Sequence, residues 1–131
     1  IGSDLVKIQR IFDLYQNYQE KFVKKILSKD EELLFSNLTN EAKKVSFLAK
    51  RFAAKEAIAK AFGTGFRGHV SLGNISILNN NLGKPEVFFA KELAESLPQK
   101  IKVLVTISDE IDLVIAFALI EQIKSPLASE T

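Results

Sequence analysis

Glu56 and Lys60 are the residues whose types and spacing first suggest chemistry in this sequence. They lie four residues apart in the Ala-rich run 51–65, so a helix places them about 40° apart on one side. The simplest interpretation is a surface Glu–Lys pair, which is common and contributes only ~0.2–0.5 kcal/mol. The alternative is a carboxylate that binds a hard cation, beside an ammonium that binds a phosphate on the same cation.

A magnesium site of this kind requires a second carboxylate, and Asp4 is the candidate because it follows the apolar start of the chain. Mg²⁺ is typically bound by one or two carboxylates together with water and substrate phosphate oxygens. A lone Asp after a strand is more often a turn or cap residue. The pairing of Asp4 with Glu56 is therefore a hypothesis about which segments the fold brings together.

A Gly63-Thr64-Gly65 turn follows Phe62. Its backbone N–H groups and hydroxyl could face phosphate oxygens, although glycines after a helix more often only end it. The turn does not match a P-loop, whose Gly-Lys-Ser/Thr opens a helix. The single histidine, His69, gives little support to a His-based triad or a multi-His metal site.

The elements that must position these residues follow from the apolar spacing and the capping residues. Ser28 is a plausible cap for a third helix, Thr39 or Asn40 caps a long helix, and Gly63 ends that helix. The expected order is a strand over 1–6 that ends at Asp4, helices over 7–17, 20–27 and from 28, the long helix 41–62, strands 74–78 and 86–90, a helix over 91–97, and strands 101–107 and 111–120. This order predicts an α+β fold in which N-terminal helices, including one long central helix, pack on a small antiparallel sheet.

Length and composition predict one soluble domain. The chain has 131 residues, of which 47% are hydrophobic and 26% are charged, as is ordinary for a globular protein. We expect a domain over residues 1–123 and a frayed tail over 124–131. The absence of cysteine excludes disulfides and thiolate metal sites and favours a cytoplasmic protein. The longest apolar stretch, 113–120, is too short to cross a membrane.

Charge is distributed unevenly along the chain. Residues 1–60 contain 12 Lys and Arg against 8 Asp and Glu, whereas residues 61–131 contain 6 against 8. This mild bias suits an acidic partner or a phosphate-bearing ligand and is too weak to indicate nucleic acid. Basic residues gather in the first two expected helices, where they form either a solvated surface or a docking patch for an acidic protein: Arg10, Lys21, Lys24 and Lys25.

Four segments, taken in order, resemble a known family. Ile1-Gly2-Ser3-Asp4-Leu5-Val6 is similar to its N-terminal Gly-x-Asp signature, and the run from Arg51 to Gly65 is similar to its central motif. Gly83-Lys84-Pro85 and Val105-Thr106-Ile107-Ser108 match two later landmarks. The family is holo-acyl carrier protein synthase, the small bacterial class of 4′-phosphopantetheinyl transferases. It often has His directly after the last segment, where this chain has Asp109, an acidic group that cannot replace the imidazole in kind.

The resemblance implies a Mg²⁺-dependent reaction in fatty acid biosynthesis. Coenzyme A donates its 4′-phosphopantetheine group to a serine hydroxyl of apo acyl carrier protein, and adenosine 3′,5′-bisphosphate is released. Asp4 and Glu56 would hold Mg²⁺ and act with Lys60 as the catalytic residues, while the proton acceptor stays open between Glu56 and a metal-bound water. The implied coenzyme A contacts are Arg51, Lys60, Gly63, Thr64, Gly65, Pro85, Ser108 and Asp109.

The resemblance also implies partners. Arg10, Lys21 and Lys25 match basic positions that the family uses to dock its acidic carrier protein. The family is trimeric with each site at a subunit boundary, so Arg51 is expected to reach a ligand of a neighbouring subunit. Neither nucleic acid nor a membrane is expected as a partner.

Two other functions compete with this one. A non-catalytic phosphate- or nucleic-acid-binding module would place aromatic and basic residues on an exposed platform, whereas most of the ten phenylalanines lie at core-like spacings. An inactive relative would keep the fold but not the turnover, and Asp109 is the reason to consider it.

Overall fold

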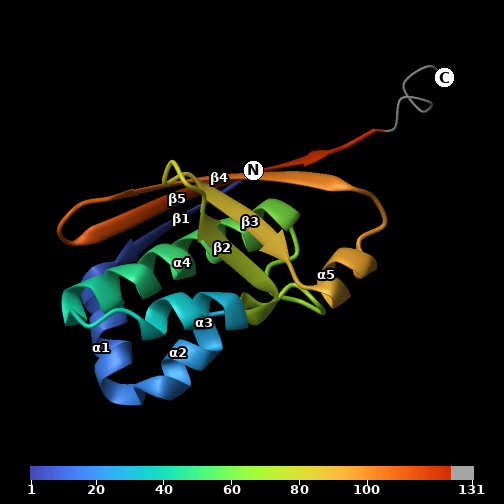
Figure 1. Cartoon of the computed structure of the whole chain (residues 1–131). Helices are drawn as coiled ribbons and strands as arrows, with labels where there is room; N and C mark the ends of the chain where they lie inside the picture. The colour runs from blue at the N-terminus through green and yellow to red at the C-terminus, as the bar shows by residue number, and fades with distance from the viewer. Residues whose placement is uncertain (125–131) are drawn as a thin grey trace.

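The computed structural model describes residues 1–124 and places one long helix beneath a three-stranded antiparallel sheet (Figure 1). Shorter helices gather below the long helix, and a separate two-stranded hairpin lies beside it. The elements are β1 (Gly2–Lys7), α1 (Ile8–Tyr18), α2 (Glu20–Ile26), α3 (Lys29–Ser36), α4 (Glu41–Phe62), a 3-10 turn η1 (Leu72–Asn74), β2 (Ile75–Asn79), β3 (Pro85–Phe89), α5 (Lys91–Ser96), β4 (Ile101–Asp109) and β5 (Leu113–Gln122). The predicted α+β fold is confirmed.

The larger sheet has the strand order β1-β5-β4, and both pairings are antiparallel. The predicted apolar last strand is therefore the central one, as its composition indicated. Asp4 lies opposite Ala116, which in turn lies opposite Ile107. The predicted end of the first strand at Asp4 is wrong, because pairing with β5 continues to Lys7. The hairpin β2–β3 pairs only within itself, so the five strands divide into two sheets.

Helix α4 has the bounds that its capping residues predicted. The Asn40 side chain accepts a hydrogen bond from Lys43 N at 3.0 Å at the start, and Gly63 ends the helix in the left-handed conformation with φ of 83°. Ala53, Ala54 and Ala57 are fully buried. These small residues let the sheet approach closely, and a Cβ added to Gly2 would lie 2.1 Å from the Ala57 carbonyl oxygen.

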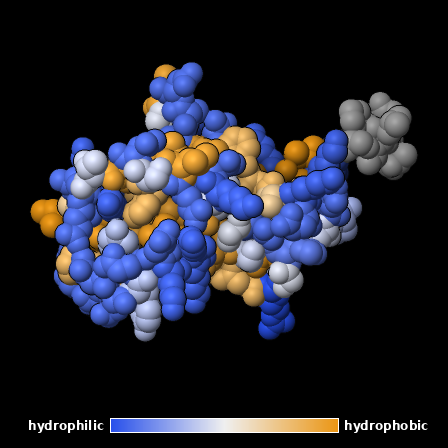
Figure 2. Space-filling model, turned by 60° about the horizontal axis from the view of Figure 1, so that its bottom comes forward, coloured by the Kyte–Doolittle hydropathy of each residue, from blue (hydrophilic) through white to orange (hydrophobic). Residues whose placement is uncertain are grey.

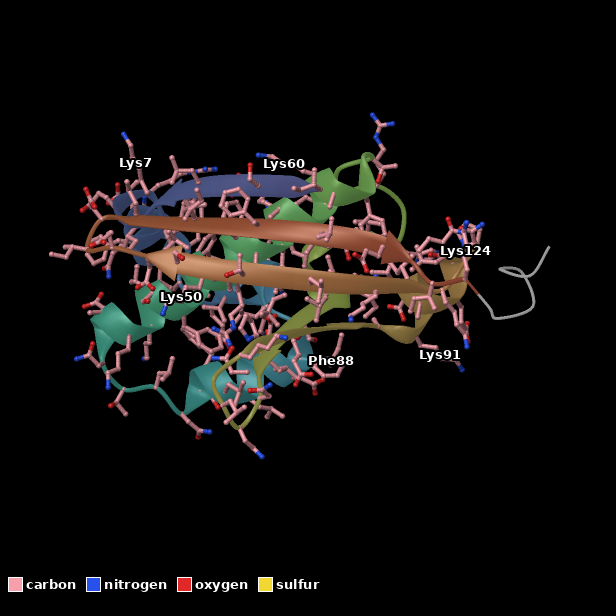
Figure 3. The ribbon with its side chains drawn as sticks, turned by 90° about the horizontal axis from the view of Figure 1, so that it is seen from above. Lys7, Lys50, Lys60, Phe88, Lys91 and Lys124 are labelled. Atoms are coloured by element: carbon pink, nitrogen blue, oxygen red, sulfur yellow. The ribbon has the colours of Figure 1, made fainter. Side chains whose placement is uncertain are left out.

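The surface has two contrasting sides. The helical side is mostly hydrophilic, with hydrophobic residues gathered across its middle (Figure 2). Figure 3 looks onto the outer face of the three-stranded sheet, opposite α4. Large apolar side chains on this face are exposed, with Leu5 at 61% and Phe117 at 46%, and Leu104 and Leu119 lie beside them.

No helix within residues 1–124 is long and apolar enough to cross a membrane. The expectation of a frayed tail falls mostly on residues 125–131, which lie outside the described part of the chain.

Gln19, at the corner between α1 and α2, has φ of 49° and ψ of −124°, a combination that side-chain-bearing residues rarely adopt. We therefore expect Gln19→Gly to raise the free energy of unfolding by about 1 kcal/mol through relief of strain, measured by urea denaturation. Gln19→Ala is the matched control, because it removes the side-chain hydrogen bond to the Gln16 carbonyl and keeps the strain. Equal stability of the two variants would contradict a strained corner.

Candidate functional site

Strand β1 brings Asp4 to the C-terminal half of α4. The Lys60 ammonium lies 3.2 Å from Asp4 Oδ1 and donates a second hydrogen bond to the Ser3 carbonyl at 3.0 Å. The Asp4 side chain is largely buried, whereas Lys60 is half-exposed and lies beside β1 (Figure 3). The two segments that the sequence singled out are therefore in direct contact, although they lie far apart along the chain.

Glu56 completes a pair of carboxylates with Asp4. Burial raises the pKa of Glu56, the nearby Asp4 charge raises it further, and Lys60 and Arg10 oppose the shift. Glu56 lies one helical turn before Lys60 on α4, and Lys60 contacts Asp4, so the two carboxylates lie on the same side of α4. Within residues 1–124 the ion pair of Lys60 is with Asp4, and the surface Glu56–Lys60 pair is not formed.

The donor set at this site fits a hard divalent cation. Its two carboxylates offer oxygen ligands, and no group of three or more His, Cys, Asp or Glu side chains arises in residues 1–124. Mg²⁺ is satisfied by one or two carboxylates when substrate phosphates and water supply the other ligands. Zinc in a structural site would require four protein ligands, which this site does not provide.

Glu56 also lines a cavity of about 620 Å³ between α1, α2, α4 and the segment that leads to η1. The three basic residues predicted to dock a carrier protein line the same cavity, namely Arg10, Lys21 and Lys25. The Arg10 guanidinium lies 5.5 Å from the centre of the Phe52 ring. The cavity therefore has a basic rim, an aromatic wall and a carboxylate of the proposed metal pair.

The turn after α4 ends the helix. Gly63 N donates to the Lys60 carbonyl at 3.0 Å, and Gly65 N donates to the Ala59 carbonyl at 3.3 Å. The Thr64 hydroxyl donates to the Gly65 carbonyl at 3.1 Å. Because the two glycine N–H groups are engaged, any contact between this turn and a phosphate depends on Thr64 or on the shape of the turn.

The remaining expected coenzyme A contacts lie away from Asp4 and Glu56. Ser108 and Asp109 end β4, the edge strand opposite β1, and Pro85 begins β3. Asp109 Oδ1 lies 3.7 Å from the ammonium of Lys50 on α4. Figure 3 shows Lys60 beside β1 and Lys50 beside the end of β4. Helix α4 therefore presents a cation at each edge of the sheet, with Lys60 at β1 and Lys50 at β4. The expected coenzyme A contacts Ser108 and Asp109 lie at the β4 edge, whereas Lys60 lies at the β1 edge.

Arg51 is buried between α3 and α4. Its guanidinium stacks 3.6 Å from the centre of the Phe47 ring, and its Nε lies 3.8 Å from Glu31 Oε2. That Nε has no hydrogen-bond partner among the described residues. Burial lowers the pKa of Arg51, and the Glu31 charge partly offsets the shift.

Sequence reasoning missed the buried pair of Glu31 and Lys55. Both side chains are fully buried, and Lys55 Nζ lies 2.5 Å from Glu31 Oε1. Burial lowers the pKa of Lys55 to about 8, opposed by Glu31. The Ser28-x-x-Glu31 spacing signals a capping box, which the structure contains. That local signal could have identified Glu31, but it carries no information about a partner on α4.

Known proteins that are similar to this chain in sequence and in structure agree with this geometry. Residues 1–117 match the 4′-phosphopantetheinyl transferase superfamily, and the chain belongs to this family. A holo-[acyl-carrier-protein] synthase of Neisseria meningitidis serogroup A is 46% identical over 124 residues, which cover 93% of this chain and 97% of that protein.

Solved structures of similar enzymes have the same fold. The crystal structure of holo-[acyl-carrier-protein] synthase from Neisseria meningitidis superposes with a TM-score of 0.83 at 42% identity, covering 92% of this chain and 96% of the other. The synthase of Bacillus anthracis in complex with CoA (3′,5′-ADP) gives 0.79 at 30% identity, covering 93% and 95%. The resemblance inferred from the four sequence segments is confirmed.

Proposed function

We propose that this chain is a holo-[acyl-carrier-protein] synthase, which transfers 4′-phosphopantetheine from coenzyme A to a serine hydroxyl of apo acyl carrier protein. The observation that carries the proposal is the contact of Asp4 with Lys60, one helical turn after Glu56, which lines a cavity with a basic rim. In a chain of this family, that arrangement joins a place for a pyrophosphate and its cation to a place for an acidic protein. We assign the reaction to the cytoplasm and to fatty acid biosynthesis.

The reaction is a displacement at phosphorus. The serine oxygen forms a bond to the phosphorus that bears pantetheine, and the bond from that phosphorus to adenosine 3′,5′-bisphosphate breaks. The serine proton passes to a base, and Glu56 is a candidate because its carboxylate lines the cavity. Lys60 contributes a fixed positive charge beside the developing negative charge on the pyrophosphate oxygens.

Asp4 and Glu56 would hold Mg²⁺, which when bound neutralises charge on the pyrophosphate. The chain's own contribution is to hold the two carboxylates on different elements, β1 and α4, at a fixed separation. Lys60 stabilises that arrangement through its contacts with Asp4 and the Ser3 carbonyl. Such positioning supplies much of the rate in reactions of this type.

The division of the expected coenzyme A contacts between two edges of the sheet supports an oligomer. Lys60 and the turn 63–65 lie at the β1 side, whereas Ser108 and Asp109 lie at the β4 edge. In an oligomer, a nucleotide that lies between two chains would touch one group from each of them. The apolar outer face of the sheet offers a surface for the association, and we propose a homotrimer.

The test is an assay with coenzyme A, Mg²⁺ and apo acyl carrier protein, followed by intact mass of the carrier. We expect the carrier serine to gain one phosphopantetheine, and adenosine 3′,5′-bisphosphate to appear in equal amount. An unmodified carrier in the presence of all three components would exclude the proposed reaction for this chain. Sedimentation of the same sample would report the oligomeric state.

Reversal of charge at Arg10 tests carrier docking. We expect Arg10→Glu to raise the KM for carrier protein by about 10-fold or more, because a basic rim residue is replaced by one that repels an acidic partner. The Kd of coenzyme A, measured by calorimetry, should change by about 2-fold or less. Lys91→Glu is the control, since Lys91 is an exposed residue of α5 outside the cavity. Equal losses in carrier use and coenzyme A binding would count against docking at Arg10.

A further inference from the structure

Lys55 makes three hydrogen bonds although it lies in the interior of the protein. Its side chain is fully buried, and its ammonium donates to the Ile26 carbonyl at 2.7 Å, the Leu72 carbonyl at 2.9 Å and Glu31 Oε1 at 2.5 Å. An ammonium has three donors, so its hydrogen-bonding capacity is used completely. One side chain of α4 thereby connects the end of α2, the start of η1 and helix α3.

Glu31 extends the same network to the second sheet. Its Oε1 also accepts from Ser28 N at 2.9 Å, which forms the capping box of α3, and its Oε2 accepts from Ile77 N in β2 at 2.8 Å. The Ser76 hydroxyl donates to the Ser28 hydroxyl at 2.6 Å. The carboxylate is therefore fixed from several directions and holds Lys55 in a single orientation.

This network lies directly behind the cavity of the proposed site. Ile26 and Leu72, whose carbonyls accept from Lys55, are both residues that line the cavity. Glu56 follows Lys55 in α4 and lines the same cavity from another side of the helix. The Lys55 ammonium thus joins two walls of the cavity to the helix that carries the reactive carboxylate.

Stability alone is a poor reason for a buried ion pair at this place. The desolvation of two charges offsets most of their attraction, so replacing such a pair with neutral residues is often neutral for stability or even favourable. Directional hydrogen bonds to three separate elements instead fix how those elements are oriented. The three elements are α2, which carries Lys21 and Lys25, together with η1 and α3, and Lys55 holds them against α4, which carries Glu56.

We infer that Lys55 and Glu31 are positioning residues for phosphopantetheine transfer, which set the separation between the basic rim on α2 and the carboxylate on α4. This inference rests on the proposed function of the site. The pair touches neither coenzyme A nor the carrier serine in this role. It determines instead whether a carrier protein docked on α2 presents its serine to the pyrophosphate beside Glu56.

The decisive variant separates folding from positioning. Lys55→Met removes the ammonium and leaves the buried carbonyls of Ile26 and Leu72 without their donor, while Glu31 keeps Arg51 as its remaining cation, so we expect a large loss of stability. Glu31→Gln together with Lys55→Met leaves neither charge at the two positions, and Arg51, stacked on Phe47, becomes the one buried charge of the three. The double variant is assayed at a temperature at which circular dichroism shows that it is folded. We expect the double variant to keep a 10- to 100-fold deficit in kcat/KM for carrier protein, the size of effect that small misplacements produce, while its Kd for coenzyme A changes by about 2-fold or less.

A second readout reports the geometry without turnover. The chain contains no cysteine, so Lys24→Cys on α2 and Ala42→Cys on α4 can carry two spin labels without background. We expect the distance distribution between the labels to broaden or shift in the Glu31→Gln/Lys55→Met background. Lys91→Met serves as the control for loss of one lysine, because Lys91 is highly exposed on α5, and it should leave the distribution unchanged.

A folded double variant with unchanged label distances and the carrier KM of the parent protein would overturn the inference. The inference would also be overturned if coenzyme A binding falls as much as carrier use, since Lys55 and Glu31 would then act on the whole site. Absence of transfer by the parent protein would instead refute the proposed function. The label distances would still decide whether the pair positions α2 against α4.

Discussion

Asp4→Ala and Glu56→Ala are each expected to reduce phosphopantetheine transfer by about 10³-fold or more, because each removes one of the two carboxylates available for the cation. The two side chains lie on different elements and meet only in the folded protein. Neither can replace the other, since a single remaining carboxylate leaves the cation held mainly by the substrate. Intact mass of the carrier protein, measured over time, gives the rate directly.

Isosteric variants separate loss of the cation from loss of shape. Asp4→Asn and Glu56→Gln keep the size of each side chain and remove its charge, so both should weaken Mg²⁺ binding measured by calorimetry in the presence of coenzyme A. Glu95→Ala is the matched control, because Glu95 is an exposed carboxylate on α5 that pairs with Lys91. Full activity in either Ala variant would remove the argument for a metal site at these residues.

The second large effect is expected at Gly2, where β1 crosses α4. A Cβ at this position would lie 2.1 Å from the Ala57 carbonyl oxygen and 2.7 Å from the Ala61 nitrogen. Both are backbone atoms of a helix and cannot move aside, so Gly2→Ala would have to displace β1. We expect the free energy of unfolding to fall by about 3 kcal/mol, the upper part of the range for overpacked cores, and transfer to fall with it because Asp4 moves with the strand.

Gly73→Ala is the control for this prediction. Nothing lies within 4 Å of a Cβ at Gly73, and its backbone is not in the left-handed region. Its stability should therefore remain within about 0.5 kcal/mol of the parent protein. Urea denaturation gives the free energy of unfolding of the two variants. Similar values for both would show that β1 approaches α4 less closely than the structure indicates.

Local rules predicted the helices well. Ser28 caps α3 and Asn40 caps α4, and Gly63 ends α4 in the left-handed conformation, each as the residue type indicated. These features depend on a few neighbouring residues, which a single sequence contains in full. The alternation over 101–107 likewise predicted a strand with one buried face, although pairing with β5 extends it to Asp109.

Features that depend on distant segments were harder to predict. Nothing in the local pattern indicates that Lys55 is buried against Glu31, because the two residues lie on different helices and meet only through tertiary packing. The separation of the hairpin from the larger sheet was equally hard to predict, since the residue pattern of a strand does not specify which strand it pairs with. The need of Mg²⁺ for a second carboxylate made Asp4 a candidate partner of Glu56, the family resemblance strengthened that pairing, and the contact of β1 with α4 explains why those two motifs belong together.

The pairing of β1 with β5 has a consequence for biosynthesis. Strand β1 is made well before its pairing partner in the sheet, which begins at Leu113, so a ribosome adding about 5–20 residues per second completes the partner on the order of ten seconds later. Asp4 therefore cannot be fixed in the sheet until β5 has been made. A growing chain of this protein would stay without activity until β5 had left the ribosome.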